Sequence, residues 1–351
     1  MIRYLNQEEK RRTRQLYESC FPEDDASFID YYYQYKTREN RILVMEEEKE
    51  SGKLQAMIHL NPYRFQVCKN AADVSYVVAV ASDPSVRRQG KMAMVMKRAL
   101  LDLAKEGQPF AFLIPANPRV YESSGFTFLP GEDYGDLRFM AREDTESLRA
   151  AELMPEPFGA AISLAPALPK DIPQMVTFAK ACMDRQYDIF PLKDEFYFRR
   201  MMEELKSQSG GFLLLKNQGE LLGMVSYGTD GIGGEIQEIL IKPGTEKILM
   251  ECLEAYFKGN PPEISDMKYM IRILSIGRLA ELLRSREPFR LKVQVTDDLI
   301  EENNGSFDIR IGEQGGSVRR IARHEAERGM DIAGLARVLF ERQRIFIREW
   351  V

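Results

Sequence analysis

The chain has 351 residues, of which 44% are hydrophobic and 29% charged, and it carries a formal net charge of −5. This composition is typical of a soluble globular protein, and the length favours two or three domains. The basic residues are spread along the chain, so the sequence lacks the clustered basic face of a nucleic-acid-binding protein. A mildly acidic protein favours a cationic small substrate instead.

The N-terminus and the hydropathy pattern predict a cytoplasmic protein without a membrane partner. The first residues contain no apolar segment of the signal-peptide kind, and no window approaches the roughly 18 apolar residues of a membrane span. The four cysteines, Cys20, Cys68, Cys182 and Cys252, lie far apart and form no CxxC pair. Two histidines, His59 and His324, complete the set, so we expect no disulfide framework, no metal site and no histidine-based chemistry.

The first third of the sequence predicts a mixed α/β sandwich. In chain order the predicted elements are helices at 7–20 and 26–35, strands at 41–45, 54–60, 64–68 and 74–81, a helix at 91–105 and a strand at 110–114. The helix at 91–105 has apolar residues recurring every three or four positions, which indicates one buried face. Helices and strands in this order are expected to pack as layers around one core.

The middle third repeats this order in degenerate form. The segment 219–225, Gly-Glu-Leu-Leu-Gly-Met-Val, is similar to 52–58, Gly-Lys-Leu-Gln-Ala-Met-Ile. A strand at 212–216 precedes this turn as 42–46 precedes the first one, and a strand and a helix follow in both copies. Seven similar positions alone could arise by chance, but the shared order of elements favours a duplicated domain.

A third part follows the Pro261-Pro262 linker. Its predicted elements are strands at 270–274, 289–295 and 306–311, a helix at 276–283, and a last helix to about residue 340 with Asp331 as N-cap. Asn303-Asn304-Gly305 predicts a hairpin turn. The tail 343–351 is apolar and basic. We therefore predict an α/β (α+β) protein with domains at 1–145, 146–266 and 267–351.

The segment Pro84-Ser85-Val86-Arg87-Arg88-Gln89-Gly90 leads into the helix at 91–105 and predicts an anion site. Unpaired backbone N–H groups and the helix dipole attract anions at a helix start. Gly90 has no Cβ that would keep an anion from the backbone, and the arginines add charge that suits a pyrophosphate. An ordinary strand–helix junction with solvated arginines explains these residues equally well, so the interpretation depends on a second motif.

That second motif, Asn117…Tyr121-Glu122-Ser123-Ser124-Gly125-Phe126, follows the next strand. Together the two motifs resemble those of the GNAT superfamily of acyltransferases. The family's P-x-x-R-x-x-G turn is matched by Pro84, Arg87 and Gly90, and its Asn…Tyr-x-x-x-Gly-Phe element by the second motif. A GNAT domain, a degenerate GNAT domain and a small sterol-carrier-like domain resemble the Eis (enhanced intracellular survival) family of acetyltransferases. The resemblance implies acetyl-CoA as cosubstrate and no metal.

The resemblance also implies which residues hold the cofactor. Val80, Ala81 and Ser82 would pair with the pantetheine arm through their backbone. Arg87 and the segment Arg88, Gln89, Gly90, Lys91, Met92 and Ala93 would contact the pyrophosphate, and Ala116 and Asn117 would lie beside the cofactor. Met92 departs from the small residue usual at its position. In the middle copy Glu246 and Leu249 correspond to Arg87 and Gly90, which predicts that this copy binds no cofactor.

Two catalytic groups follow from the same resemblance. Tyr121 occupies the position of the general acid, and a tyrosine, with a pKa near 10, is able to protonate a departing thiolate, with a pKa near 8.5. The terminal carboxylate, here that of Val351, occupies the position of the base. A carboxylate is a weak base for an ammonium, so we expect it to hold the ammonium and accept its proton. The structural alternatives are a core tyrosine and a tail that only packs.

Acidic residues at the first loop, namely Glu23, Asp24, Asp25 and Asp30, are candidates for the mouth of a cation pocket. Trp350 replaces the family's penultimate acidic residue, with Glu349 one step earlier, and the last domain is shorter than the family norm. The resemblance implies acetyl transfer to a primary amine of an aminoglycoside-like or polyamine-like molecule or of a lysine. It also implies a homo-oligomer, a hexamer in Eis-like proteins. The alternatives are a catalytically silent CoA- or lipid-binding regulatory protein, and a lipid-carrier role for the last domain.

Overall fold

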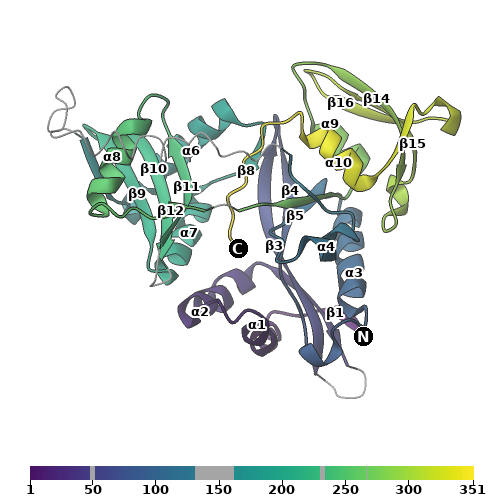
Figure 1. The fold of residues 1–351 in the computed structure, drawn as a ribbon, viewed down its shortest axis with the longest axis horizontal. Helices are drawn as coiled ribbons and strands as arrows, with labels where there is room; N and C mark the ends of the chain where they lie inside the picture. The colour runs from purple at the N-terminus through teal and green to yellow at the C-terminus, as the bar shows by residue number, and fades with distance from the viewer. Residues whose placement is uncertain (48–51, 131–161, 230–233, 266) are drawn as a thin grey trace.

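The computed structural model describes residues 1–47, 52–130, 162–229, 234–265 and 267–351, which form three sheets with their helices (Figure 1). The predicted boundary between the first two domains, at residue 145, lies outside the described residues. None of the described helices has the length and apolar character needed to cross a lipid bilayer.

The N-terminal sheet is sandwiched between two groups of helices. Its strands, in spatial order, are β1 (Ile2–Tyr4), β2 (Arg41–Glu46), β3 (Leu54–Val67), β4 (Asn70–Ser82), β5 (Phe110–Leu113), β13 (Met270–Ile273) and β6 (Thr127–Phe128), with β8 (Ile189–Pro191) paired to β3. Alternate residues of β2 pack on opposite faces, because side chains alternate along a strand. Ile42 contacts the core under α1 (Arg14–Cys20) and α2 (Ala26–Gln34), and Leu43 contacts the core under α3 (Lys91–Lys105).

The strand β3 is continuous where the sequence predicts two strands. Pro62, between the two predicted strands, lies in a stretch where β3 pairs with β4 alone. Pairing with β2 ends at Leu60, and pairing with β8 begins at Phe65. A proline is tolerated on such an open strand edge, because the missing N–H has no partner to lose.

The middle domain repeats the N-terminal order, as predicted. Its sheet consists of β12 (Glu263–Ile264), β11 (Gly234–Ile241), β10 (Glu220–Thr229), β9 (Gly211–Asn217) and β7 (Ile162–Pro166), and its helices are α6 (Ile172–Gln186), α7 (Glu195–Ser207) and α8 (Glu246–Tyr256). In both domains an antiparallel three-stranded meander is followed by a helix and a parallel return strand. The shared connectivity supports the interpretation of a duplicated domain.

The C-terminal domain has a four-stranded sheet of β16 (Gly316–Arg320), β15 (Gly305–Ile311), β14 (Phe289–Thr296) and β17 (Arg328–Asp331), packed against α9 (Ile276–Leu282) and α10 (Ile332–Phe340). The predicted N-cap is confirmed, since Asp331 Oδ1 accepts a hydrogen bond from Gly334 N–H at 2.7 Å. The β14–β15 hairpin is confirmed, but its connection is longer than a two-residue turn. Asn303 is buried there and bonds the backbone of Ile276 instead of forming the turn.

The strand β13 does not belong to the domain in which the sequence places it. The predicted boundary at residue 267 puts Met270–Ile273 in the C-terminal domain, but β13 inserts between β5 and β6 of the N-terminal sheet. Its Arg272 is fully buried and donates to both carboxylate oxygens of Asp297, at 2.7 and 2.9 Å. Gly125, at φ +81°, packs closely against this arginine. A Cβ at this position would lie only 2.9 Å from Arg272 Nε, so the packing requires glycine.

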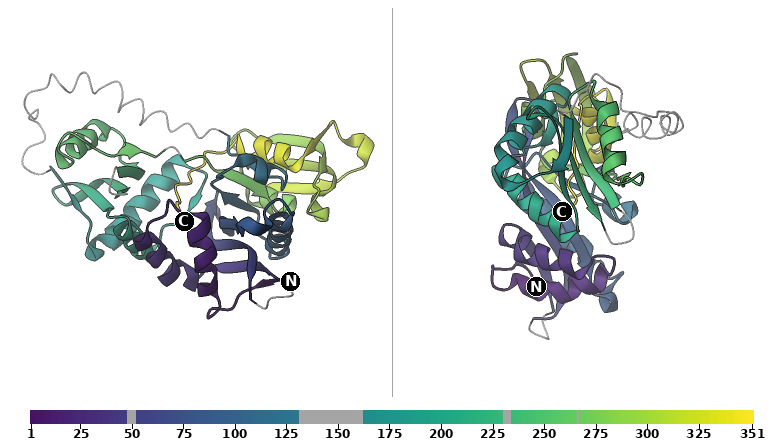
Figure 2. Two further views of the ribbon diagram at one scale, coloured as in Figure 1. Left: turned by 60° about the horizontal axis from the view of Figure 1, so that its bottom comes forward. Right: turned by 90° about the vertical axis from the view of Figure 1, so that its left-hand side faces the viewer.

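The last residues leave the C-terminal domain and cross to the centre of the molecule, between the N-terminal sheet and the middle domain (Figures 1 and 2). The tail is held by its backbone: Phe346 N–H donates to the Ile189 carbonyl at 2.9 Å, and Ile345 forms a parallel bridge with Ile189. The C-terminal residue is therefore fixed near the N-terminal helices rather than left free in solvent.

Replacing Asp297 by alanine is expected to lower the stability of the fold by about 3–5 kcal/mol, because it leaves the buried guanidinium of Arg272 without a counter-charge. Urea or thermal unfolding followed by circular dichroism measures the change. The control is Asp184→Ala, which removes an exposed i,i+4 partner of Lys180 and should shift stability by no more than about 0.5 kcal/mol. Equal shifts in the two variants would show that the Arg272–Asp297 pair does not stabilise the domain junction.

Candidate active site

One cavity of about 1150 Å³ lies between the N-terminal and middle domains. Its lining combines helices α1 and α2, the loop between them, strand β4, the segment after β5, and the last two residues of the chain. From the middle domain it includes Gln208, Gly228, Gly234, Glu235 and Phe257, with the following segment Asn260, Pro261, Pro262 and Glu263. The predicted site residues Val80, Ala116, Tyr121 and Val351, which are distant in sequence, meet in this cavity.

The cavity opens where β4 and β5 separate. The two parallel strands pair only at Ser75–Ala111 and Tyr76–Phe112. Beyond this point β4 carries a bulge: Ala79 has φ +48°, and it has no register partner in β3. A bulge adds a residue to one strand and bends it away from its neighbour. Residues 77–80 and Ile114 consequently line the cavity at the point where the two strands separate.

The predicted anion turn has the geometry expected of it. Gly90 is the N-cap of α3 in the left-handed region at φ +74°, with open space where a Cβ would point. The first helical hydrogen bond runs from Met94 N–H to the Gly90 carbonyl at 3.2 Å, so the N–H groups of Lys91, Met92 and Ala93 have no acceptor within the helix. Arg88 is also left-handed, at φ +63°. The turn is exposed and outside the cavity lining, and Arg87 reaches back to the Ser82 carbonyl at 3.4 Å.

The second motif forms the short helix α4 (Pro118–Glu122) at the other side of the opening. Asn117 is its N-cap and accepts a hydrogen bond from Arg119 N–H at 3.2 Å, so its side chain has a structural role. Tyr121 is 7% exposed and faces the cavity. No described residue forms a hydrogen bond with its hydroxyl group, and burial raises its pKa. The phenol is therefore protonated at neutral pH and has a proton to donate.

The chain's last two residues form part of the cavity wall. Val351 is 8% exposed, and its carboxyl oxygen accepts hydrogen bonds from Lys36 and, at 2.6 Å, from the Tyr63 hydroxyl. The Tyr76 hydroxyl donates to the Trp350 carbonyl at 3.0 Å. Three side chains that the sequence analysis did not select thus fix the end of the chain. Their signal was weak, since Tyr63 and Tyr76 look like ordinary alternating strand residues.

Glu349 does not enter the cavity. It is 1% exposed and accepts hydrogen bonds from Tyr197 at 2.9 Å and from Lys193 at 3.4 Å. Lys193 also pairs with Glu238 of β11 at 2.8 Å. An ion pair this deeply buried requires nearly all its polar atoms to be satisfied. The carboxylate of Glu349 therefore anchors the tail to the middle domain, and the two residues that follow it, Trp350 and Val351, line the cavity.

The cavity wall is acidic. Glu23, Asp24 and Asp25 line it from the α1–α2 loop, and Glu235 and Glu263 line it from paired strands of the middle domain. None of the described residues that line it is Lys, Arg or His. Asp24 accepts a hydrogen bond from Tyr17 at 2.6 Å, and burial raises the pKa of its carboxyl group. The sequence-based choice of Asp30 is wrong, because this residue forms an ion pair with Arg14 and does not line the cavity.

The described part of the middle domain has no counterpart of the anion turn. Eight residues separate β4 from α3, but only four separate β11 from α8, whose N-cap is Thr245. The correspondence of Leu249 with Gly90 is therefore wrong: Leu249 lies one turn inside the helix and is 1% exposed. The difference is a shortened loop rather than a substitution. A loop of four residues has no room for the extra turn that precedes Gly90 in the first copy.

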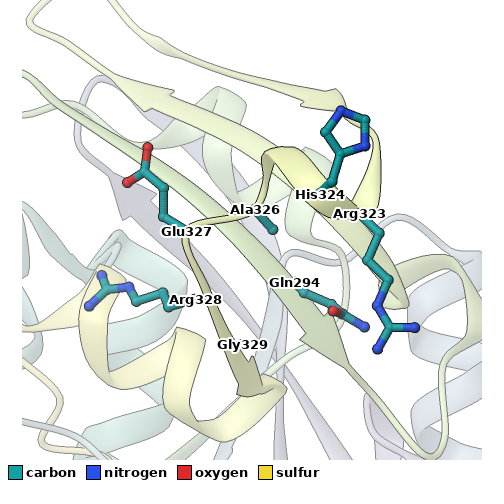
Figure 3. A pocket seen from close by; sticks show the side chains of 7 residues that line it. All are labelled: Gln294, Arg323, His324, Ala326, Glu327, Arg328 and Gly329. Carbon is teal, nitrogen blue, oxygen red and sulfur yellow. The ribbon is translucent and has the colours of Figure 1, made fainter.

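A second hollow lies in the C-terminal domain beside β14 and β17. It is lined by Gln294, Arg323, His324, Ala326, Glu327, Arg328 and Gly329 (Figure 3). The side chains of His324 and Glu327 spread outward instead of converging on one point. The other histidine, His59, is fully buried, and burial lowers its pKa to about 3. Among the described residues no three His, Cys, Asp or Glu side chains are arranged to hold a metal ion.

Comparison with known proteins finds family models that match the N-terminal and C-terminal parts of the chain. The acetyltransferase (GNAT) domain model matches residues 1–129, and a sterol carrier protein domain model matches residues 278–345. The chain begins with a GNAT acetyltransferase domain. No curated protein sequence matches the chain at a significant level.

The chain shares its fold with several solved structures. A GCN5-related N-acetyltransferase from Anabaena variabilis has a TM-score of 0.71 at 14% identity, over 97% of this chain and 90% of that one. A protein of unknown function from Enterococcus faecalis, described as a probable N-acyltransferase, has a TM-score of 0.73 at 14% sequence identity, and the match covers 99% of both chains. Eis1 from Mycobacterium abscessus has a TM-score of 0.66 at 15% sequence identity, and the match covers 97% of this chain and 89% of that one. The predicted tandem GNAT-like fold with a sterol-carrier-like domain is confirmed.

Binding of a ligand in the cavity is expected to change the fluorescence of Trp350, the only tryptophan in the sequence. Trp350 lines the cavity together with the acidic residues, so an acyl-CoA or a cationic amine would alter the polarity around its indole. Emission excited at 295 nm would be followed during titration, with Trp350→Phe as the control for ligand absorbance. Unchanged emission with both ligands at saturation would place the binding site elsewhere.

Proposed function

We propose that the protein transfers an acetyl group from acetyl-CoA to a primary amine on a small polycation, such as a polyamine-like or aminoglycoside-like molecule, or on a lysine. The observation that carries the proposal is the composition of one cavity. It combines a protonated tyrosine whose hydroxyl has no hydrogen-bond partner among the described residues, the carboxyl group of Val351 and five further carboxylic side chains, with no basic side chain among its described lining residues.

The reaction assigns a task to each part of the cavity. The CoA pyrophosphate would bind the N–H groups at the start of α3, and the pantetheine arm would lie along residues 80–82 of β4. The amine nitrogen attacks the thioester carbonyl, and the oxyanion forms beside the bulged backbone at Ala79. As the intermediate collapses, the C–S bond breaks and the thiolate takes the proton of Tyr121. Amide formation removes two protons from the ammonium nitrogen. The Val351 carboxylate accepts the first before the attack, and the second, lost from the nitrogen of the tetrahedral intermediate, restores the Tyr121 phenolate to a phenol. The products are therefore the amide, free CoA and one proton carried by Val351.

The second candidate is a catalytically silent protein that binds CoA or lipid. The free hydroxyl of Tyr121 favours the enzyme, because a core tyrosine without a catalytic role would be expected to bond a protein acceptor when buried. The β4–β5 opening is common to both candidates, so binding of acetyl-CoA alone does not separate them.

Replacing Tyr121 by phenylalanine is expected to lower kcat by about 10²-fold, since a general acid contributes roughly 10²–10⁴ to the rate. Acetyl-CoA affinity, measured by calorimetry, should stay nearly unchanged at one site per chain, because the hydroxyl is not part of the predicted phosphate contacts. Thiol release measures turnover with a panel of amines. An unchanged kcat would remove Tyr121 from the mechanism, and absence of acetyl-CoA binding in the wild type would contradict the proposed function itself.

The double substitution Glu235→Gln/Glu263→Gln is expected to raise KM for a polyamine roughly fivefold, since each exposed charge contributes less than about 1 kcal/mol. The effect should be larger for a polyamine than for a monoamine, and it should shrink at high salt because salt screens exposed charges. Glu301→Gln/Glu313→Gln in the C-terminal domain removes the same charge from exposed positions outside the cavity and serves as control. Equal KM values in both double variants would show that the acidic wall does not select the substrate.

A further inference from the structure

A buried lysine holds the carboxyl group of Val351 from outside the cavity. Lys36 is 3% exposed and begins the short helix η2 (Lys36–Arg38) after α2. Its Nζ donates to the Val351 carboxyl oxygen, which also accepts the Tyr63 hydroxyl. Lys36 is not among the residues that line the cavity, whereas Val351 is, so the lysine reaches the Val351 oxygen from within the protein.

The same lysine is paired with the middle domain. Its Nζ lies 3.1 Å from Glu204 Oε2 on α7, and the side chain of Glu204 is 1% exposed. The Tyr31 hydroxyl of α2 donates to that oxygen at 3.0 Å. Arg200, one turn earlier on α7, lies over the Tyr63 ring at 5.4 Å. One ammonium thus connects the end of the chain, the N-terminal sheet and a helix of the middle domain.

The charges around Lys36 depend on one another. The groups that face it are Glu204 and Arg200 from α7, the carboxyl group of Val351 and Glu349 from the tail, and Tyr63 from β3. Without the ammonium, two buried carboxylates would share this space with only Arg200 to balance them. An uncompensated buried charge is strongly destabilising, so we expect the tail to leave its position.

We propose that Lys36 is the positioning residue that fixes the Val351 carboxylate toward the substrate ammonium, and that Glu204 makes this position depend on the docked middle domain. The middle domain would then serve acetyl transfer without binding a cofactor. The inference rests on the proposed function, in which the Val351 carboxylate accepts the proton of the ammonium.

The charge of Lys36 is expected to make kcat depend on pH. Burial, aided by the positive charge of Arg200, lowers the pKa of Lys36 to about 8. The ammonium charge is therefore present below pH 8 and is lost as the pH rises through this value. We expect kcat to fall above about pH 8 in the wild type, although the substrate amine becomes more reactive as it loses its proton. In Lys36→Met this descending limb should be absent.

The first test measures the position of the tail without using activity. Lys36→Met removes the charge and keeps much of the side-chain length. Carboxypeptidase should release Val351 from this variant at least about tenfold faster than from the wild type, and Trp350 emission should shift to the red as the indole becomes solvated. Lys180→Met, at an exposed site on α6, is the control and should behave as the wild type. Equal release of Val351 from Lys36→Met and the wild type would overturn the proposal.

The second test is a double-mutant cycle on kcat, using Lys36→Met, deletion of Val351 and their combination. If Lys36 acts through the carboxylate, each single change lowers kcat about tenfold or more, and the combination is no slower than the deletion alone. Independent, multiplicative losses would overturn the proposal. Acetyl-CoA calorimetry verifies that each variant is folded.

Glu204→Gln provides a second route if Lys36→Met does not fold. It keeps the lysine and the shape of the site but removes the counter-charge from the middle domain, so Val351 should again be released faster; unchanged release would contradict the role of Glu204. Should the wild type acetylate no amine at all, the proposed function would fail, and carboxypeptidase release would still decide whether Lys36 holds the tail.

Discussion

Two buried lysines hold Glu349 and Val351 at the end of the chain, and the arrangement of the cavity depends on them. Lys193 pairs with Glu349 and Glu238, and Lys36 bonds Val351 and pairs with Glu204. Each lysine joins the tail to a carboxylate of the middle domain. A buried ammonium is tolerated only when its counter-charges are in place. The tail position, the domain contact and the cavity wall are therefore parts of one electrostatic arrangement.

The duplicated domain shows how one connectivity supports two tasks. In the first copy, eight residues between β4 and α3 leave space for an exposed turn with a left-handed glycine, and a bulge opens β4 from β5. In the second copy the corresponding loop is four residues shorter, and the helix starts at once. The second copy instead contributes charged side chains. Glu235 and Glu263 lie in the cavity wall, and Glu204 of α7 pairs with Lys36, which bonds the tail. A fold thus sets positions, while loops and side chains determine what is done there.

The sequence predicts the local features of this protein better than its long-range ones. The helix at 91–105 was predicted with its observed limits, and Asp331 as an N-cap, because periodicity and capping are encoded in neighbouring residues. The insertion of β13 into the N-terminal sheet was missed, since a four-residue apolar strand carries no information about which sheet it joins. Lys36 and Glu204 were missed for the same reason: each is an unremarkable charged residue until distant segments bring the pair together. Motif resemblance located Tyr121, yet not the acidic residues that the middle domain adds.

The insertion of β13 also determines when the N-terminal sheet is able to complete its folding during translation. The edge of β5 stays open until Met270–Ile273 arrive to pair with it, more than 150 residues later in the chain. The nascent N-terminal sheet therefore exposes unpaired backbone while these intervening residues are translated, a state that invites pairing with other chains. A fragment cut after the family-matched residues 1–129 would keep that open edge permanently. Chimaeric proteins that graft residues 1–129 onto another scaffold would need to include the distant strand β13 as well.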